Sequence, residues 1–141
     1  MKRRYRLRDQ ERFKRVRQAG ASYAHPYLVL YVLPNGLDIS RSGFVTSRRI
    51  GKAIVRNRAR RRMSEAVRLV WDLVEPGWDM VWIARPAINE AEFTALQQAS
   101  VRLLRRAGIL QTGHDPTIRE RSLREAGALP VGSGSGTDLQ L

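Results

Sequence analysis

A run of basic residues from Ser47 to Arg62 is the part of the sequence best suited to chemistry, namely to the binding of phosphate. Nine of its sixteen residues are Lys, Arg or Asn, whose side chains donate hydrogen bonds. Arginine grips phosphate with two parallel hydrogen bonds and also stacks on bases, so the excess of arginine favours structured RNA over an anionic membrane surface. A merely solvated helix face normally mixes both signs of charge, yet the only acid between Ser47 and Asp72 is Glu65.

The sequence shows no catalytic group of its own. It has no Ser-His-Asp, Cys-His or clustered carboxylate pattern, no cysteine, and only two widely separated histidines, His25 and His114. We therefore expect no catalytic residue and no metal ligand set in the protein. A metal-dependent nuclease would need a carboxylate cluster, and Asp72, Glu75 and Asp79 offer only a weak candidate because a Pro-Gly turn separates them.

The overall charge points to a polyanionic partner. The chain has 141 residues, of which 26 are Lys or Arg and 13 are Asp or Glu, a formal net charge of +13. Such an excess opposes a compact fold unless a polyanion neutralises it, so we expect nucleic acid as the partner. No apolar run approaches the roughly 20 residues of a membrane-spanning helix and no signal peptide begins the chain, so we expect a cytoplasmic protein.

The elements before the basic segment are predicted from turn and capping residues. A short helix follows Leu7, with Asp9 as its N-cap and Gly20 as its end. Residues 27–33 and 37–46 predict two strands, and the Pro-Asn-Gly between them predicts that they pair as a β-hairpin.

The elements after it follow from helical periodicity. Residues 51–74 predict a helix, residues 78–84 a further strand, and Asn89 with Glu92 a capping box that starts a last helix ending at Gly108. The apolar stripe predicted to bury the long helix consists of Val55, Ala59, Met63, Ala66, Val67, Val70, Leu73 and Val74. We expect one domain over residues 1–110 and a disordered tail over residues 111–141, which carry few large apolar groups.

The segment from Gly43 to Arg61, GFVTSRRIGKAIVRNRARR, resembles the signature of the bacterial ribonuclease P protein family. The shared features are a serine followed by two basic residues, a Gly-Lys-Ala step, and Arg-Asn-Arg with further basic residues behind it. Glu11-Arg12-Phe13, the YLVLYV strand and Ile83-Ala84-Arg85 also look like the family's, so the resemblance covers roughly residues 5 to 107.

This resemblance implies a particular fold. It is a compact α+β domain with the element order αβββαβα, similar to domain 2 of ribosomal protein S5. The sheet is mostly antiparallel, and the basic helix lies in a left-handed crossover, against the usual right-handed rule.

The resemblance also implies a function. The protein would be the RNA-binding subunit of ribonuclease P, an endoribonuclease whose RNA subunit is the catalyst and holds the Mg²⁺. Its partners would be that RNA and precursor tRNA, from which the 5′ leader is removed, with no role for DNA or a membrane. The residues implied to bind the RNA subunit are Arg48, Arg49, Lys52, Arg56, Asn57, Arg58, Arg60 and Arg61.

The leader is implied to lie in a cleft that contains Phe13 and Tyr31. An aromatic ring gives an unpaired base a sequence-tolerant stacking surface, although ordinary core packing explains either ring as well. Where many family members have a second aromatic residue one turn later, this chain has Arg17, which suits a cleft that also grips phosphate. Composition alone would equally fit a structural RNA-binding protein of the ribosome, and the continuous Arg-Asn-Arg signature argues against that alternative.

Overall fold

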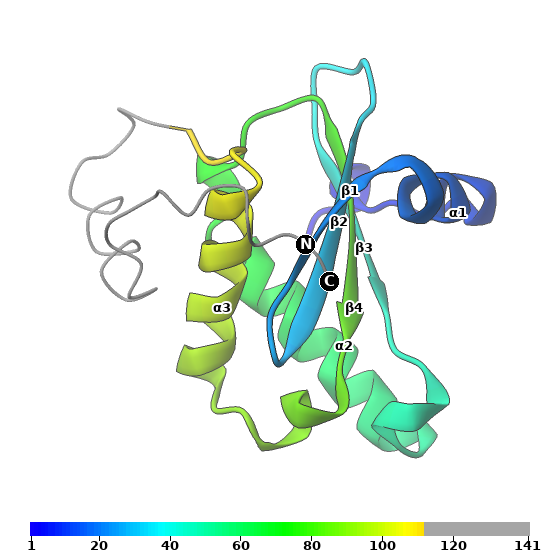
Figure 1. Ribbon diagram of the computed structural model, residues 1–141, viewed down its shortest axis with the longest axis vertical. Helices are drawn as coiled ribbons and strands as arrows, with labels where there is room; N and C mark the ends of the chain where they lie inside the picture. Colours follow the sequence, from blue (N-terminus) through cyan, green and yellow to red (C-terminus); the bar gives the residue numbers. More distant parts are fainter. Residues whose placement is uncertain (112–141) are drawn as a thin grey trace.

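The computed structural model describes residues 1–111, which form one four-stranded sheet with helices on both faces (Figure 1). The predicted tail therefore lies outside the described residues, apart from Gln111. No helix in the described part is long and apolar enough to cross a membrane. The principal elements are α1 (Gln10–Ala19), β1 (Ala21–Ala24), β2 (Leu28–Pro34), β3 (Arg41–Val45), α2 (Ala53–Arg68), β4 (Trp78–Ala84) and α3 (Phe93–Arg106).

The sheet has the strand order β1-β2-β4-β3, which corrects the predicted hairpin. β2 pairs with β1 on one side and with β4 on the other, both antiparallel, so it does not touch β3. The true hairpin joins β1 to β2 through a turn at His25 and Pro26, and the sequence prediction missed β1. The Pro-Asn-Gly turn indicated pairing between strands that are neighbours in the sequence. β2 pairs instead with β4, in which Trp78, the partner of Pro34, lies 44 residues further along the chain.

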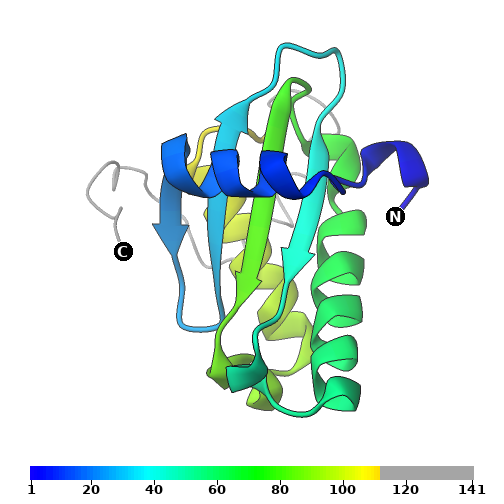
Figure 2. The same ribbon diagram turned by 90° about the vertical axis from the view of Figure 1, so that its right-hand side faces the viewer.

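β3 and β4 are parallel, and α2 connects them. Figure 2 views the sheet from the α1 side, where both strands run downward, β4 lies to the left of β3, and α2 belongs to the far face. If the view is rotated in its plane so that both strands run upward, the chain leaves β3, passes behind the sheet through α2, and returns as β4 to the right of β3. The crossover is therefore left-handed, as the resemblance implied.

The two faces of the sheet carry cores of different size. Leu30, Met80 and Trp82 point toward α2 and α3 and belong to the main core, in which these three side chains are fully buried. The opposite face is covered by α1, where Val16 packs against Val81. Figures 1 and 2 show α1 lying alone across this face, so one side of the sheet is only partly covered. That incomplete cover leaves room for a surface groove.

Helix boundaries agree with the prediction for α1, whereas α2 ends earlier than predicted and α3 begins without its predicted cap. The Asp9 carboxylate caps α1 by accepting a hydrogen bond from the Glu11 amide at 2.9 Å, and Gly20 follows the helix. The predicted burial is confirmed, since seven of the eight side chains of the apolar stripe are buried and the eighth is half-buried. The predicted helix over residues 51–74 is too long: α2 ends at Arg68, so Val70, Leu73 and Val74 are buried beyond its end. The predicted capping box is wrong: α3 begins after Glu92 without a side-chain cap, and Asn89 donates instead to the Ile50 carbonyl at 2.9 Å.

Candidate RNA-binding site

The basic face of α2 is held outward because the opposite face of the same helix is buried. Ala59, Met63, Ala66 and Val67 pack in the main core, which fixes the rotation of the helix about its axis. Six of the predicted RNA-subunit residues are exposed, and Arg56 and Arg60 are half-buried. The six exposed residues are Arg48, Arg49, Lys52, Asn57, Arg58 and Arg61.

The turn before α2 is a built structure and not a loose loop. Arg48–Ile50 form a short 3-10 helix whose Ile50 side chain is buried in the main core. Gly51 has φ of 141°, a left-handed conformation that a side chain would strain. The Arg56 guanidinium reaches back and donates to the Gly51 carbonyl at 2.8 Å. Arg56 therefore shapes the turn that presents the exposed Arg48 and Arg49.

Arg60 links the basic face of α2 to the sheet. Its Nη1 donates to the Asn57 side-chain oxygen at 2.7 Å, and its Nη2 donates to the Thr46 hydroxyl at 2.8 Å. These two bonds fix the guanidinium at the end of β3, where it also lines a groove on the α1 face. The basic helix and the groove therefore meet at Arg60.

This groove runs between α1 and the sheet, and it brings together all three residues predicted to hold the leader. Phe13 and Arg17 reach it from α1, and Tyr31 reaches it from β2. Sequence reasoning missed the remaining lining residues, although Lys14 and Gln18 share one side of α1 and their helical spacing was the signal that could have found them. The missed residues are Gln10, Glu11, Lys14, Gln18, Phe44, Val45 and Thr46. Cationic, amide and aromatic groups therefore share one open groove.

Phe13 and Tyr31 serve the packing of the sheet face and the lining of the groove at the same time. Both are half-buried, and both pack against the small core around Val16 and Val81. The Phe13 ring lies so close over Gly43 that an added Cβ would stand 2.2 Å from the ring's Cζ atom. The glycine in β3 is therefore needed for the position of the ring.

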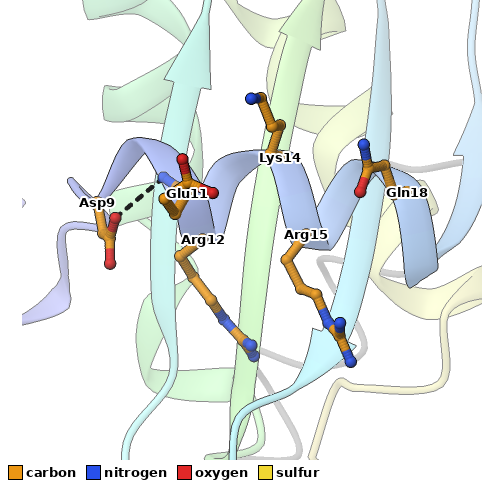
Figure 3. Close-up of a pocket in the computed structure, with 6 residues that line it drawn as sticks. All are labelled: Asp9, Glu11, Arg12, Lys14, Arg15 and Gln18. Carbon is orange, nitrogen blue, oxygen red and sulfur yellow. Dashed lines mark hydrogen bonds between the residues drawn. The ribbon is translucent and has the colours of Figure 1, made fainter.

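The two sides of α1 have different tasks. Figure 3 shows Lys14 and Gln18 projecting from one side of the helix and Arg12 and Arg15 projecting from the other. The first pair lines the groove, whereas Arg12 donates to the Asp79 carboxylate of β4 at 2.6 Å. Lys14 and Gln18 thus face the groove, whereas Arg12 fastens the other side of α1 to the sheet and Arg15 beside it is exposed.

Asp79 is the residue of the sheet to which Arg12 attaches α1. Its side chain has no exposed surface, and Arg41 binds both of its oxygens, at 2.9 and 2.8 Å. The Asn35 side chain adds a third partner at 2.9 Å. Burial alone would raise the pKa of Asp79, but hydrogen bonds from Arg41, Asn35 and Arg12 outweigh it and hold the pKa below its ordinary value. One carboxylate therefore ties together α1, β3, β4 and the loop after β2.

The three acids around the Pro-Gly turn have different surroundings. Asp79 is buried and paired with two arginines, whereas Asp72 and Glu75 are exposed. Among residues 1–111 no group of three or more His, Asp or Glu side chains is placed to hold a metal ion.

Comparison with known proteins identifies the family. The model of the family described as Ribonuclease P matches residues 1–108. The ribonuclease P protein component of Roseiflexus castenholzii is 52% identical over 112 residues, which is 79% of this chain and 92% of that protein. The corresponding protein of Chloroflexus aurantiacus is 47% identical over 119 residues, 84% of this chain and 88% of the relative. The chain belongs to the ribonuclease P protein family.

Solved structures of ribonuclease P proteins have the same fold. The protein from Thermotoga maritima superposes with a TM-score of 0.66 at 32% identity, covering 72% of this chain and 96% of the other. A protein from Staphylococcus aureus gives 0.69 at 25% identity, covering 76% and 98%. The predicted fold class is confirmed, and the ribosomal alternative loses its support. As a ribonuclease P protein, the chain is part of an endoribonuclease complex that acts in tRNA processing.

Proposed function

We propose that this protein binds the RNA subunit of ribonuclease P through the basic face of α2 and the 5′ leader of precursor tRNA through the groove beside α1. The observation that supports this proposal is the meeting of the two surfaces at Arg60, whose guanidinium bonds to Asn57 on one side and to Thr46 in the groove on the other. Two RNA segments bound there would lie next to each other.

The basic face of α2 has the chemistry of a phosphate-binding surface. Arg58 and Arg61 are exposed and pair with no carboxylate among the described residues, where the ion pairs involve only Asp79 and Glu65. Each phosphate that such a guanidinium neutralises releases counterions, so the affinity for RNA falls steeply with salt. Catalysis gains because repulsion between two polyanionic RNAs is screened where they meet.

The groove has the chemistry of a binder of unpaired nucleotides. The half-buried rings of Phe13 and Tyr31 offer stacking surfaces, and stacking is worth about 1–3 kcal/mol per base. Arg17 and Lys14 supply positive charge for the backbone in the same groove. None of these groups reads base edges in a fixed pattern, which suits leaders of differing sequence. A leader-bearing precursor would therefore bind better than mature tRNA.

The protein supplies binding and the RNA subunit supplies the chemistry. We assign the Mg²⁺ that activates water for phosphodiester hydrolysis mainly to the RNA subunit, in a cytoplasmic complex. Support comes from the types of residue present: the groove offers guanidinium, amine, amide and aromatic groups, with Glu11 as its one carboxylate. A single carboxylate among cations is a poor ligand set for Mg²⁺, which prefers several oxygen ligands.

Two sets of variants separate the two surfaces. Arg58→Ala and Arg61→Ala should weaken binding of the RNA subunit and reduce the salt dependence of that binding, with the preference for precursor over mature tRNA retained. Arg17→Ala should reduce that preference and leave affinity for the RNA subunit unchanged. Arg68→Ala is the matched control, because it removes one surface charge that Glu65 already pairs at 2.6 Å.

The measurements are filter binding of the RNA subunit, and of precursor and mature tRNA to the assembled complex. If Arg17→Ala leaves the affinity for leader-bearing precursor undiminished, the electrostatic part of the groove proposal is wrong. If the α2 variants behave like Arg68→Ala, the RNA subunit binds elsewhere on the protein.

A further inference from the structure

A second group of basic side chains lies around the turn between β1 and β2, and it shares no residue with the two surfaces described above. It consists of His25 in the turn, Arg85 at the end of β4, and Arg102 and Arg106 on α3, and we call it the His25 patch. Arg85 donates to the His25 carbonyl at 3.3 Å and Arg106 to the Ala24 carbonyl at 2.9 Å. The end of β4 and α3 therefore both bring cations to this one turn.

Two arginines of this patch, Arg85 and Arg102, carry charge that no acid in the described part of the chain cancels. Arg85 and Arg102 are exposed, and neither forms an ion pair with any carboxylate of residues 1–111. Burial and the nearby charges of Arg102, Arg106 and Arg85 lower the pKa of His25 to about 4. The imidazole is therefore neutral at neutral pH and responds to the charge around it.

The arrangement places like charges close together on one helix. Arg102 and Arg106 are four residues apart on α3, the spacing at which like charges destabilise a helix. Arg102 also lowers the pKa of the half-buried Arg105, second to the effect of burial. A bound polyanion would offset the positive charge that Arg85 and Arg102 place around His25, which makes a ligand a good explanation of these two exposed arginines.

The patch is separate from the two proposed RNA surfaces. α3 and α2 both cover the face of the sheet opposite α1, and Figure 2 shows α3 behind the β1–β2 side and α2 toward the β3 side. The groove lies on the α1 face, beside Tyr31 of β2. Because β3 and β4 are parallel, Arg85 lies at the same end of the sheet as the Arg48–Ile50 turn, so an RNA bound to the basic face of α2 could continue to the patch.

We propose that the His25 patch is a further RNA-binding surface, which holds backbone phosphates of the RNA subunit through Arg85 and Arg102. This proposal rests on the proposed function. Phosphate is the ligand that best fits exposed guanidinium groups, because each can form two parallel charge-assisted hydrogen bonds with its oxygens. Its exposed side chains Arg85 and Arg102 are phosphate-binding guanidinium groups, so it would add affinity mainly without sequence preference.

The test compares single variants of the full-length protein that remove one charge each. Arg85→Ala and Arg102→Ala are set against Arg68→Ala, and Arg102→Lys restores the charge. We expect Arg85→Ala and Arg102→Ala each to lower affinity for the RNA subunit severalfold and to reduce the slope of log K against log salt by about 1. Arg102→Lys should retain most of the affinity, and thermal melts check that all variants fold.

Three further outcomes would overturn the proposal. The first is that Arg85→Ala and Arg102→Ala have the same affinity for the RNA subunit as Arg68→Ala, although the wild-type protein binds that RNA and promotes leader cleavage. In that case the proposed function stands and only the proposal for the patch is wrong. The second is an effect confined to precursor tRNA in the assembled complex, which assigns the phosphates to tRNA. The third is loss of binding to anionic phosphatidylserine vesicles with RNA binding intact, which makes the patch a membrane contact.

A direct signal of occupancy comes from His25 itself. Phosphates bound to Arg85 and Arg102 would offset the charges that act on the imidazole, so the pKa of His25 should rise from about 4 when the RNA subunit binds. NMR titration of the His25 ring in the free protein and in the complex measures this change. An unchanged pKa in a saturated complex would contradict phosphate binding at the patch.

Discussion

Replacing Asp79 by Asn should destabilise the protein strongly although the two side chains have nearly the same shape. The carboxylate is fully buried and accepts from Arg12 at 2.6 Å and from Arg41 at 2.8 and 2.9 Å. Removing one partner of a buried ion pair costs about 3–5 kcal/mol because the remaining charge is left uncompensated. The Arg12 and Arg41 side chains are 26% and 30% exposed, so water relieves part of that cost and we expect the lower value, about 3 kcal/mol.

This loss is large enough to measure by heat or by urea. For a chain of this size about 3 kcal/mol corresponds to a fall in Tm of about 12 °C. The matched control is Glu65→Gln, which removes a carboxylate from the surface pair with Arg68, whose partners are 47% and 48% exposed. That variant should leave the Tm nearly unchanged, because an exposed pair contributes little.

The acid dependence of stability gives a second reading of the same site. Because the folded-state pKa of Asp79 lies below the unfolded-state value, its contribution is complete above about pH 4 and is lost as the pH falls through the folded-state pKa. Asp79→Asn should therefore be less stable at pH 7 and lose less stability below pH 4. Equal unfolding free energies of wild type and Asp79→Asn at pH 7, measured in urea, would refute the clamp between α1 and the sheet.

Three further predictions address single positions. The folded-state pKa of His25, about 4, lies below its unfolded-state value of about 6.5, so wild type should lose stability between pH 6.5 and 4, and urea melts of His25→Gln should lack that loss. Gly43→Ala should displace the Phe13 ring, cost about 1–3 kcal/mol and weaken leader binding, and normal leader affinity would contradict the assigned ring position. Arg62→Ala should lower the Tm, because Arg62 donates to the carbonyls of Ile88 and Ala91. It should reduce RNA affinity less than Arg61→Ala does, and an equal loss of RNA affinity in both variants would contradict a structural role for Arg62.

The sequence predicts well those features that depend on local periodicity. The stripe from Val55 to Val74 specifies which face of α2 is buried, and the exposure of Arg58 and Arg61 follows from it. The Asp9 cap and the end at Gly20 are likewise properties of a few neighbouring residues. These predictions succeed because each rests on interactions within one helix.

Strand order and buried polar partners depend on contacts far apart in the chain, and there local reasoning fails. The Pro-Asn-Gly turn indicated a hairpin, but β2 forms seven residue pairs with β4, and β3 lies on the far side of β4. Asp79 interrupts an apolar strand, and no local pattern shows that its partners come from α1, β3 and the loop after β2. The positions of Arg17 and Tyr31 in the groove follow from the family resemblance, because the fold of the family already includes the contacts between distant parts of the chain. Their binding to the leader stays a prediction.

The most direct test of the proposed function is cleavage of a precursor tRNA by a bacterial ribonuclease P RNA at low Mg²⁺, with and without this protein. The Mg²⁺ concentration should be one at which the RNA alone is nearly inactive, so that screening by the protein limits the rate. The account predicts protein-dependent cleavage at the mature 5′ end, which an excess of free leader oligonucleotide would reduce. Absence of stimulation with several such RNAs, by protein that is folded and binds RNA, would contradict it.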